Sequence, residues 1–439
     1  MSDPAPRAND STVATASRRS WRDWLGLNAS TLALLGAIFL VTASTELWSP
    51  LVPQYLKALR ERALAGDVGL VWLIGLYGFY RDALEALNYY VGGAVAGRIN
   101  TRRALLIFNL LPLAGLAVLM RWQSPGAVFV AVPFLFVWDS VAGPAVVSVV
   151  GDALPADRRT MAFSLQAILR RLSRMAAYLV SGLMVWRFGR VQGVRGDALI
   201  ACGLVLFAWG VQFRLMRTGS RDAVRAWHRP RALWRRFPAD LRVLLAADVL
   251  ARWAEGIAKP FLILYCVPLL SAALDRGTAA YQSVLLNIEA ATNIALYVAV
   301  GPLASRAGLA KRPYIGLSFV FFGVFPLLVP VLGGAWGAAG LMLAYVLAGG
   351  REIGEPARKA MIAELVPVDV KTQAIGLYWA ARGVAVAGAA PVGALLWLAG
   401  ERWHPGGGPY STFMAAGCAG LAGAVLFYAR FGRRAGVNR

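Results

Sequence analysis

The sharpest chemical pattern in the sequence is a set of four charged residues inside one apolar stretch. At spacings of four, three and four residues, they are Asp248, Arg252, Glu255 and Lys259. In a helix these spacings place the side chains on one face, with alternating sign. A charge inside a membrane costs at least about 2.5 kcal/mol, so this face is expected to meet protein or water. The pattern indicates either a wall that binds a polar solute or a ladder of ion pairs that satisfies itself.

Three acidic residues in other apolar stretches are candidates for carrying a proton. In order of preference they are Glu46, Asp139 and Glu289. Glu46 lies four residues before Pro50 and has no basic residue nearby in its own stretch. A lone carboxyl removed from water favours its protonated form. We therefore expect Glu46 to carry a proton; the alternative is an ion pair with an arginine of another helix, such as Arg81 or Arg170.

An internal repeat relates the two halves of the chain. Residues 144–170 match residues 356–382 at a constant offset of 212 positions, and paired prolines, aspartates and arginines fall in register. The same offset pairs Asp139 with Arg351 and Arg170 with Arg382. Opposite charges at equivalent positions could bind two ends of a substrate, and the paired arginines could hold an anion or a carboxylate. The alternative for both pairs is structural ion pairing.

These candidates lie in a strongly apolar chain. Its 439 residues are 58% hydrophobic, with a mean hydropathy of +0.56. Apolar runs near the roughly 20 residues that cross a bilayer recur along the whole length. The sequence predicts an all-α membrane protein of twelve transmembrane helices in two pseudo-symmetric six-helix bundles, because duplicated sets of hydrophobic helices are typical of secondary transporters. The expected segments are a polar tail 1–28, a first bundle 29–216, a basic linker 217–240, a second bundle 241–430 and a basic tail 431–439.

Charged residues avoid every third predicted helix. The predicted helices without a charge in their interiors are 103–121, 197–216, 313–333 and 409–430. Because intramembrane charges face protein or water, we expect these four helices to face lipid. The other eight predicted helices are expected to surround a polar cavity.

Basic residues concentrate in the tails and in alternate predicted loops, above all in the stretch 214–242. This asymmetry predicts a multi-pass protein of the cell inner membrane with both termini in the cytoplasm. The net charge of +22 is therefore assigned to anionic lipid headgroups rather than to nucleic acid. The first apolar run, from about residue 30, is too long for a signal peptide.

We expect no cofactor, no metal site and no enzyme activity. The cysteines Cys202, Cys266 and Cys418 lie in apolar stretches, and the two histidines, His228 and His404, lie in predicted loops. A glycine-rich loop followed by Lys and Ser or Thr, which would bind ATP, is missing from the sequence. A nucleophile with a neighbouring base is not found either, so an intramembrane enzyme is the weakest interpretation.

Two basic motifs after the second and eighth predicted helices resemble the loop signature of the major facilitator superfamily, Gly-x-x-x-Asp-Arg-x-Gly-Arg-Arg. The two copies comprise Gly93, Arg98, Arg102 and Arg103, and then Gly301, Arg306, Lys311 and Arg312. The acid of the signature is replaced by Gly97 and Ser305. The resemblance covers about residues 30–430. It implies two six-helix halves that rock about a central site, with the motif bases supporting this motion rather than binding substrate.

Together these patterns predict a monomeric secondary transporter that moves a small organic solute by alternating access. Its coupling ion is expected to be the proton, and efflux is favoured over uptake. The candidate charges that would contact the solute are Arg170, Arg252, Glu255, Lys259, Arg351 and Arg382. The alternatives are a proton-coupled uptake symporter and a membrane sensor or assembly protein that keeps the fold without transporting.

Overall fold

A computed structural model describes residues 29–63, 67–96, 101–138, 159–215, 229–273, 278–305, 311–367 and 371–432. Helices make up these segments, joined by short turns. The predicted polar tail 1–28, Asp139 and most of the linker 217–240 lie outside the described residues. The all-α class predicted from the sequence is thus confirmed for the part of the chain that the structure describes.

The first part of the chain forms α2 (Ala29–Trp48), η1 (Ser49–Leu51), α3 (Val52–Ala63), α4 (Asp67–Ala96), α5 (Thr101–Arg121), α6 (Pro125–Leu135) and α8 (Arg159–Leu215). The short 3-10 helix η1 contains Pro50, whose missing N–H cannot continue an α-helix. Two predicted helices, 160–186 and 197–216, are arms of α8. The arms meet at Gly189, whose φ of 78° is readily adopted only by glycine.

The second part forms α9 (Pro230–Arg235), α10 (Ala239–Ala273), α11 (Thr278–Ser305), α12 (Lys311–Gly349), η2 (Gly350–Glu352), α13 (Glu355–Leu365), α14 (Lys371–Ala387), α15 (Ala389–Trp403) and α16 (Gly408–Phe431). A second glycine with positive φ, Gly337, divides α12 into two arms. The predicted helix 337–363 is broken at η2, and the predicted helix 372–399 is interrupted at Gly388. Irregular backbone inside a membrane is tolerated where protein or water surrounds it, and protein buries Gly350 and Arg351 of η2.

Several helices are long and apolar enough to cross a membrane. Among the described residues, five stretches meet this criterion by length and composition: Leu35–Arg60, Ile168–Leu215, Arg312–Lys359, Ala374–Trp403 and Gly408–Phe431. The more charged helices α4, α10 and α11 have 30, 35 and 28 residues, which also exceeds the roughly 20 needed. The protein is therefore a multi-pass helical membrane protein. The count of twelve crossings stays a prediction, because residues 139–158 are not described.

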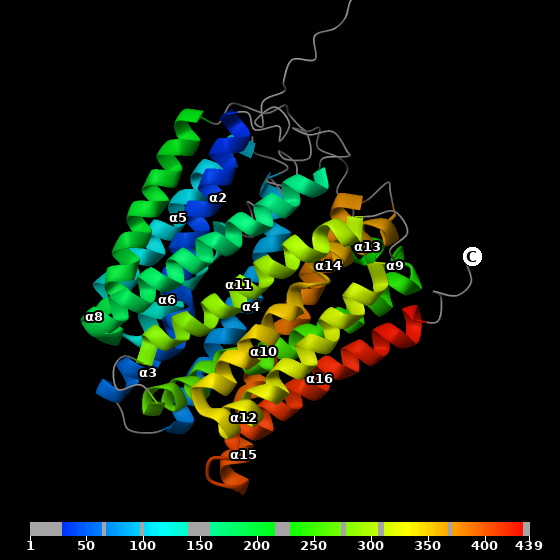
Figure 1. Cartoon of the computed structure of the whole chain (residues 1–439). Coiled ribbons are helices and arrows are strands. Elements are labelled where there is room, and N and C mark those ends of the chain that lie inside the picture. Colours follow the sequence, from blue (N-terminus) through cyan, green and yellow to red (C-terminus); the bar gives the residue numbers. More distant parts are fainter. Residues whose placement is uncertain are drawn as a thin grey trace, which may run out of the picture.

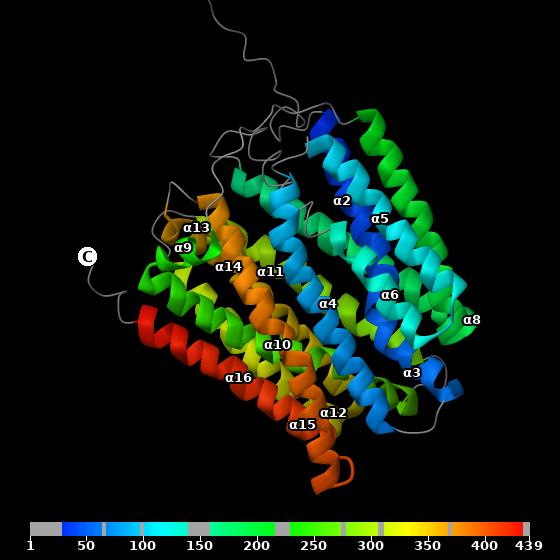
Figure 2. The ribbon, with the colours of Figure 1, turned by 180° about the vertical axis from the view of Figure 1, so that it is seen from behind.

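The helices pack as two neighbouring groups. The helices that precede residue 216 lie beside those that follow residue 229 (Figures 1 and 2). One apolar core is formed only by residues between 43 and 201, and two others only by residues between 233 and 431. A smaller cluster joins the groups, where Leu70, Val71 and Ile74 of α4 meet Phe261 of α10 and Ala394 of α15.

Small residues let α4 approach the second group closely. Figure 2 shows α4 running beside α14 and α15. A methyl group placed on Gly78 would lie 2.6 Å from Cβ of Ala390, closer than real Cβ contacts occur. Across the same contact, Ala86 of α4 meets Gly383 of α14. Helices in membranes pack best through such small residues, so this seam holds the two groups together.

The helices predicted to face lipid expose apolar side chains. Examples are Ile107 on α5, Phe207 on the second arm of α8, Val331 on the first arm of α12 and Val425 on α16. The charged residues of these predicted helices lie at their ends, and one of them, Asp197 at the start of the predicted helix 197–216, is fully buried on α8 beside Ser181. The sequence alone does not identify this carboxyl as an intramembrane charge, because Asp197 falls at the end of a predicted helix.

The native cysteine Cys418 can test the prediction that α16 faces lipid. Cys418 is exposed on α16, whereas Cys266 is buried. In membranes, a lipid-soluble maleimide is expected to label Cys418, while a sulphonated, impermeant maleimide is not, from either side. Cys418→Ala should remove the signal, and Lys259→Cys in that background should restore labelling by the impermeant reagent, because that side chain is expected to meet water. Efficient labelling of Cys418 by the impermeant reagent would contradict the arrangement.

Candidate functional site

A buried ion pair forms the centre of the charged region in the second group of helices. Asp248 of α10 is fully buried, and its Oδ1 lies 2.7 Å from Nη1 of Arg358 on α13. The hydroxyl of Tyr378 on α14 donates a hydrogen bond of 3.1 Å to the other carboxylate oxygen. Arg382 of α14 lies 3.6 Å from that same oxygen. Three elements therefore meet at one carboxylate.

The four charged residues predicted on one face of α10 do not form one continuous set of ion pairs. Glu255 accepts a hydrogen bond of 2.8 Å from Arg252, and Lys259 lies 3.5 Å from its other oxygen. This part is the ladder of the alternative interpretation. Asp248 is not part of this ladder, because its ion partner is Arg358 of α13 rather than Arg252 of its own helix. Arg252 also reaches outward, to Glu355 of α13 at 3.5 Å and over the ring of Phe322 at 4.8 Å.

Glu355 is shared by three basic residues. It forms an ion pair with Arg358, another with Arg252, and a third with Lys359 at 3.2 Å. The sequence prediction did not assign a role to Glu355. Its place at the start of α13, one turn before Arg358 and Lys359, is a signal that could have identified it.

Arg351 and Glu289 form an ion pair between η2 and α11. Nη2 of Arg351 lies 2.6 Å from Oε1 of Glu289, and its Nε donates to the carbonyl of Ala348 at 3.0 Å. The guanidinium also lies over the rings of Phe325, at 4.6 Å, and Phe322, at 5.6 Å. Glu289, a predicted proton carrier, is therefore held by one arginine. The predicted partnership of Arg351 with Asp139 lies outside the described residues.

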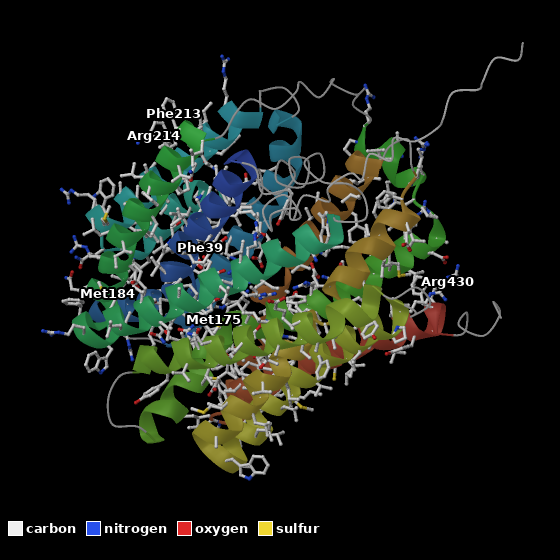
Figure 3. All side chains as sticks on the ribbon, turned by 45° about the horizontal axis from the view of Figure 1, so that its top comes forward. Phe39, Met175, Met184, Phe213, Arg214 and Arg430 are labelled. Atoms are coloured by element: carbon white, nitrogen blue, oxygen red, sulfur yellow. The ribbon has the colours of Figure 1, made fainter. Side chains whose placement is uncertain are left out.

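Glu46 is not the lone acid that the sequence predicts. Its Oε1 lies 2.8 Å from Nε of Arg174 on α8, and Tyr178 donates a hydrogen bond of 3.0 Å to Oε2. The structure therefore has the alternative that the sequence left open, an ion pair with an arginine of another helix, although this arginine is Arg174 rather than Arg81 or Arg170. α2 packs along α8, where the hydroxyl of Ser173 donates to the carbonyl of Phe39; Figure 3 labels Phe39 on α2.

Direct polar contacts cross between the two groups of helices. Arg171 of α8 lies 3.1 Å from Oε2 of Glu352 on η2, and Tyr297 of α11 donates to the same oxygen at 3.4 Å. Gln282 of α11 donates to the carbonyl of Pro50 at 3.0 Å. Tyr178 of α8 donates its hydrogen bond to Glu46 of the first group and is also influenced electrostatically by Glu289 of the second group. Sequence reasoning missed Arg171, Arg174 and Glu352, since only the packing of α8 against α11 selects them.

The equivalent arginines Arg170 and Arg382 both lie near Lys359. Each is within electrostatic range of its ammonium group, although they belong to different groups of helices. The Arg382 guanidinium is stacked over the ring of Trp379 at 4.1 Å. The side chains of Lys359 and Lys259 are 61% and 57% exposed.

The loop motifs are only partly within the described residues. Gly93 and Gly301 fall inside α4 and α11, Arg103 is exposed, and Nη1 of Arg312 donates to the carbonyl of Phe431 at 3.3 Å. Arg98 and Arg306, and the side chains of Arg102 and Lys311, lie outside the described part of the chain. Their role in the conformational change stays a prediction. Within the described segments, His, Cys, Asp and Glu form no cluster of three or more that could hold a metal ion.

Comparison with solved structures identifies the overall fold of the chain. The chain matches no protein-family model and no curated protein. Among solved structures, a mutant of the peptide transporter POT in complex with sulfate has a TM-score of 0.72 at 17% sequence identity, covering 92% of this chain and 94% of that chain. The human organic anion transporter MFSD10 (TETRAN) has a TM-score of 0.66 at 15% identity, covering 91% and 99%. A mutant of the nucleoside transporter NupG has a TM-score of 0.69 at 14% identity, covering 91% and 99%. The chain therefore has the major facilitator fold that its loop motifs and repeated halves predict.

Proposed function

We propose that the protein is a secondary transporter that moves a small organic solute across the inner membrane by alternating access, coupled to protons. Its bundles, residues 29–216 and 241–430, cross the membrane twelve times in total. The basic linker 217–240 and both termini lie in the cytoplasm, beside anionic lipid headgroups. The protein acts as a monomer. The fold shared with transporters supports the class of function, whereas the charged contacts described above support coupling and a polar solute.

The observation that carries the proposal is a pair of carboxylates on α2 and α11, helices of different halves that both pack against α8. Glu46 has Arg174 as its ion partner, and Glu289 has Arg351. Tyr178 is bonded to Glu46 and lies within electrostatic range of Glu289. Protonation of Glu46 removes a charge from its side of this contact and releases Arg174. Because such a change alters attraction between the halves, it can bias which side of the membrane the site opens to.

The structural neighbours support a small polar solute. They include a peptide transporter, an organic anion transporter, a nucleoside transporter and a transporter solved with 5-aminolevulinic acid. The candidate contacts for the solute in this chain are Arg170, Arg252, Glu255, Lys259, Arg351 and Arg382. Efflux is favoured over uptake, and the direction is decided by the experiment.

The proposal is tested with purified protein in proteoliposomes that contain a pH-sensitive dye. A panel of anionic, zwitterionic and neutral solutes is added under an imposed pH gradient of either sign. We expect at least one solute to be accumulated against its gradient, together with a proton flux that protein-free liposomes lack. The sign of the gradient that drives accumulation separates antiport from symport. Solute movement without any proton flux would contradict proton coupling, and no movement of any solute would favour a non-transporting role.

A further inference from the structure

The short helix α9, at the end of the basic linker, carries arginines on one face and apolar side chains on the other. Trp234 lies three residues and Arg235 four residues after Arg231, so the three side chains share one face of the helix, and all three are exposed. On the opposite face Leu233 is buried, and Phe237 is buried just after the helix ends. α9 is therefore amphipathic, with an open basic face.

The apolar face of α9 fixes the helix to the second group. α9 packs against α14 (Figure 1). Leu233 and Phe237 belong to the apolar core that also contains Tyr378, the residue that donates a hydrogen bond to the buried Asp248. A ligand on the basic face of α9 is thus linked by direct packing to the charged site of α10, α13 and α14.

Two further arginines flank the basic face. Arg229 is exposed and directly precedes the helix, and Arg242 of α10 reaches back to its end. Nη2 of Arg242 donates to the carbonyl of Trp234 at 3.3 Å and to that of Arg235 at 3.4 Å. A six-residue helix is only about 9 Å long, so the four arginines are gathered in one small area. We call this area, formed by Arg229, Arg231, Trp234, Arg235 and Arg242, the arginine surface.

The arginine surface has no counter-charge within the described residues. None of its four arginines forms an ion pair with a described carboxylate, and Asp240 has Arg430 as its ion partner at 2.6 Å. Like charges four residues apart on a helix, such as Arg231 and Arg235, repel one another. Trp234 is 39% exposed, and a tryptophan beside basic residues is typical of the level of lipid headgroups. An anion bound here removes the repulsion, and an anion that carries acyl chains also covers the indole.

We propose that the arginine surface binds the phosphate headgroup of an anionic phospholipid, with Trp234 against its acyl chains, and that this lipid stabilises the second group of helices. The inference rests on the part of the proposed function that places the basic linker beside anionic headgroups, and it names the residues that bind. A free phosphate ion offers the same charge but leaves the exposed indole in water. The exposed ring beside the arginines therefore favours the lipid.

The test titrates phosphatidylglycerol into the purified full chain, in detergent micelles that contain phosphatidylcholine, and measures the midpoint of thermal unfolding. We expect a saturable rise in the midpoint. One arginine near an anionic lipid surface changes affinity about fivefold, so Arg231→Gln combined with Arg235→Gln should raise the half-saturating lipid fraction at least about tenfold. Arg231→Lys combined with Arg235→Lys should keep most of the affinity, because lysine keeps the charge.

The matched control removes two other exposed arginines that lie beside aromatic rings. They are Arg121, next to Trp122, and Arg187, next to Phe188, with distances of 5.8 and 5.6 Å from guanidinium carbon to ring centroid. Arg121→Gln combined with Arg187→Gln should respond to phosphatidylglycerol as the unaltered protein does, because neither residue belongs to the arginine surface. An equal loss of affinity in this variant would show a general effect of net charge and overturn the inference.

Inorganic phosphate, added with phosphatidylcholine alone at constant ionic strength, separates the lipid from a free ion. We expect it to leave the midpoint unchanged, and a phosphate effect that the double glutamine variant abolishes would overturn the lipid in favour of a free-anion site. A midpoint that does not respond to phosphatidylglycerol, or a response that the double glutamine variant keeps in full, would also overturn the inference. No solute takes part in these measurements, so they test the lipid surface whether or not the proteoliposomes transport a solute.

Discussion

Replacing Asp248 with alanine is expected to unfold a large fraction of the protein. Asp248 is fully buried, and Arg358, which is 2% exposed, would lose the ion pair that ties α13 to α10 and keep only Glu355 of its own helix. Removing one partner of a buried ion pair costs about 3 to 5 kcal/mol, because the other charge stays buried without its counterpart. Against a typical total stability of about 5 to 15 kcal/mol, this is a large share. The measurement is the thermal unfolding midpoint, with the monodisperse fraction on size exclusion as a second readout.

Two further variants show whether the loss comes from the unpaired charge. Asp248→Ala combined with Arg358→Leu removes both charges, and it should recover much of the lost stability because an apolar pair can replace a buried ion pair. Asp240→Asn, at the ion pair with Arg430 whose side chains are 23% and 39% exposed, should change stability by less than about 1 kcal/mol. An Asp248→Ala protein that unfolds at the wild-type temperature would show that this ion pair does not hold α10, α13 and α14 together.

The second large effect is expected from Glu46→Gln, which should abolish proton-driven accumulation while solute exchange down its gradient continues. The amide is neutral, as the protonated acid is, and its oxygen can still accept the hydrogen bond from Tyr178. The variant should therefore resemble a carrier fixed in its protonated form. In proteoliposomes the accumulated solute should fall to the external concentration, and counterflow of labelled solute should persist.

Glu255→Gln is the matched comparison for this variant. Glu255 lies on α10, the counterpart of α2 in the second half, and it holds Arg252 and Lys259. Its neutralisation should lower stability or solute affinity rather than remove coupling alone, because two basic side chains lose a partner. If Glu46→Gln still accumulates solute with unchanged pH dependence, Glu46 is not the carrier, and Glu289 or Asp139 takes its place as the candidate.

Much of the architecture could be predicted from local patterns in the sequence. Apolar runs of membrane-spanning length, the offset of 212 residues between the halves and the basic loop motifs all point to the fold that the structure has. These signals are local or periodic. A helix in lipid must satisfy its own backbone hydrogen bonds, so its length and apolar composition can be recognised in the sequence. The charged face of α10 was also readable, since spacing along a helix fixes which side chains share a face.

The breaks in the helices were harder to locate. Pro50 lies in the 3-10 turn η1, five residues before Tyr55. Its counterpart in the second half, Pro260, lies five residues before Tyr265 but within the continuous α10. The same residue type therefore interrupts one helix and not its counterpart. The packing of neighbouring helices decides which outcome has the lower free energy, and a proline in the sequence does not reveal those neighbours.

The partners of the charges were decided by the tertiary structure alone. The sequence identified Glu46, Glu289, Arg351 and Arg382 as intramembrane charges. For Glu46, however, it offered Arg81 or Arg170 as the alternative partner, and it left Arg174 and Glu355 without roles. Arg170, Arg171 and Arg174 lie within five residues on one helix, and a small rotation of α8 changes which of them meets α2 and which meets η2. Ion pairing acts over a few ångströms between helices distant in sequence, so only their packing selects the pairs. The sequence alone determined that the charges lie inside a membrane protein of two related halves, and the fold determined which charges neutralise one another.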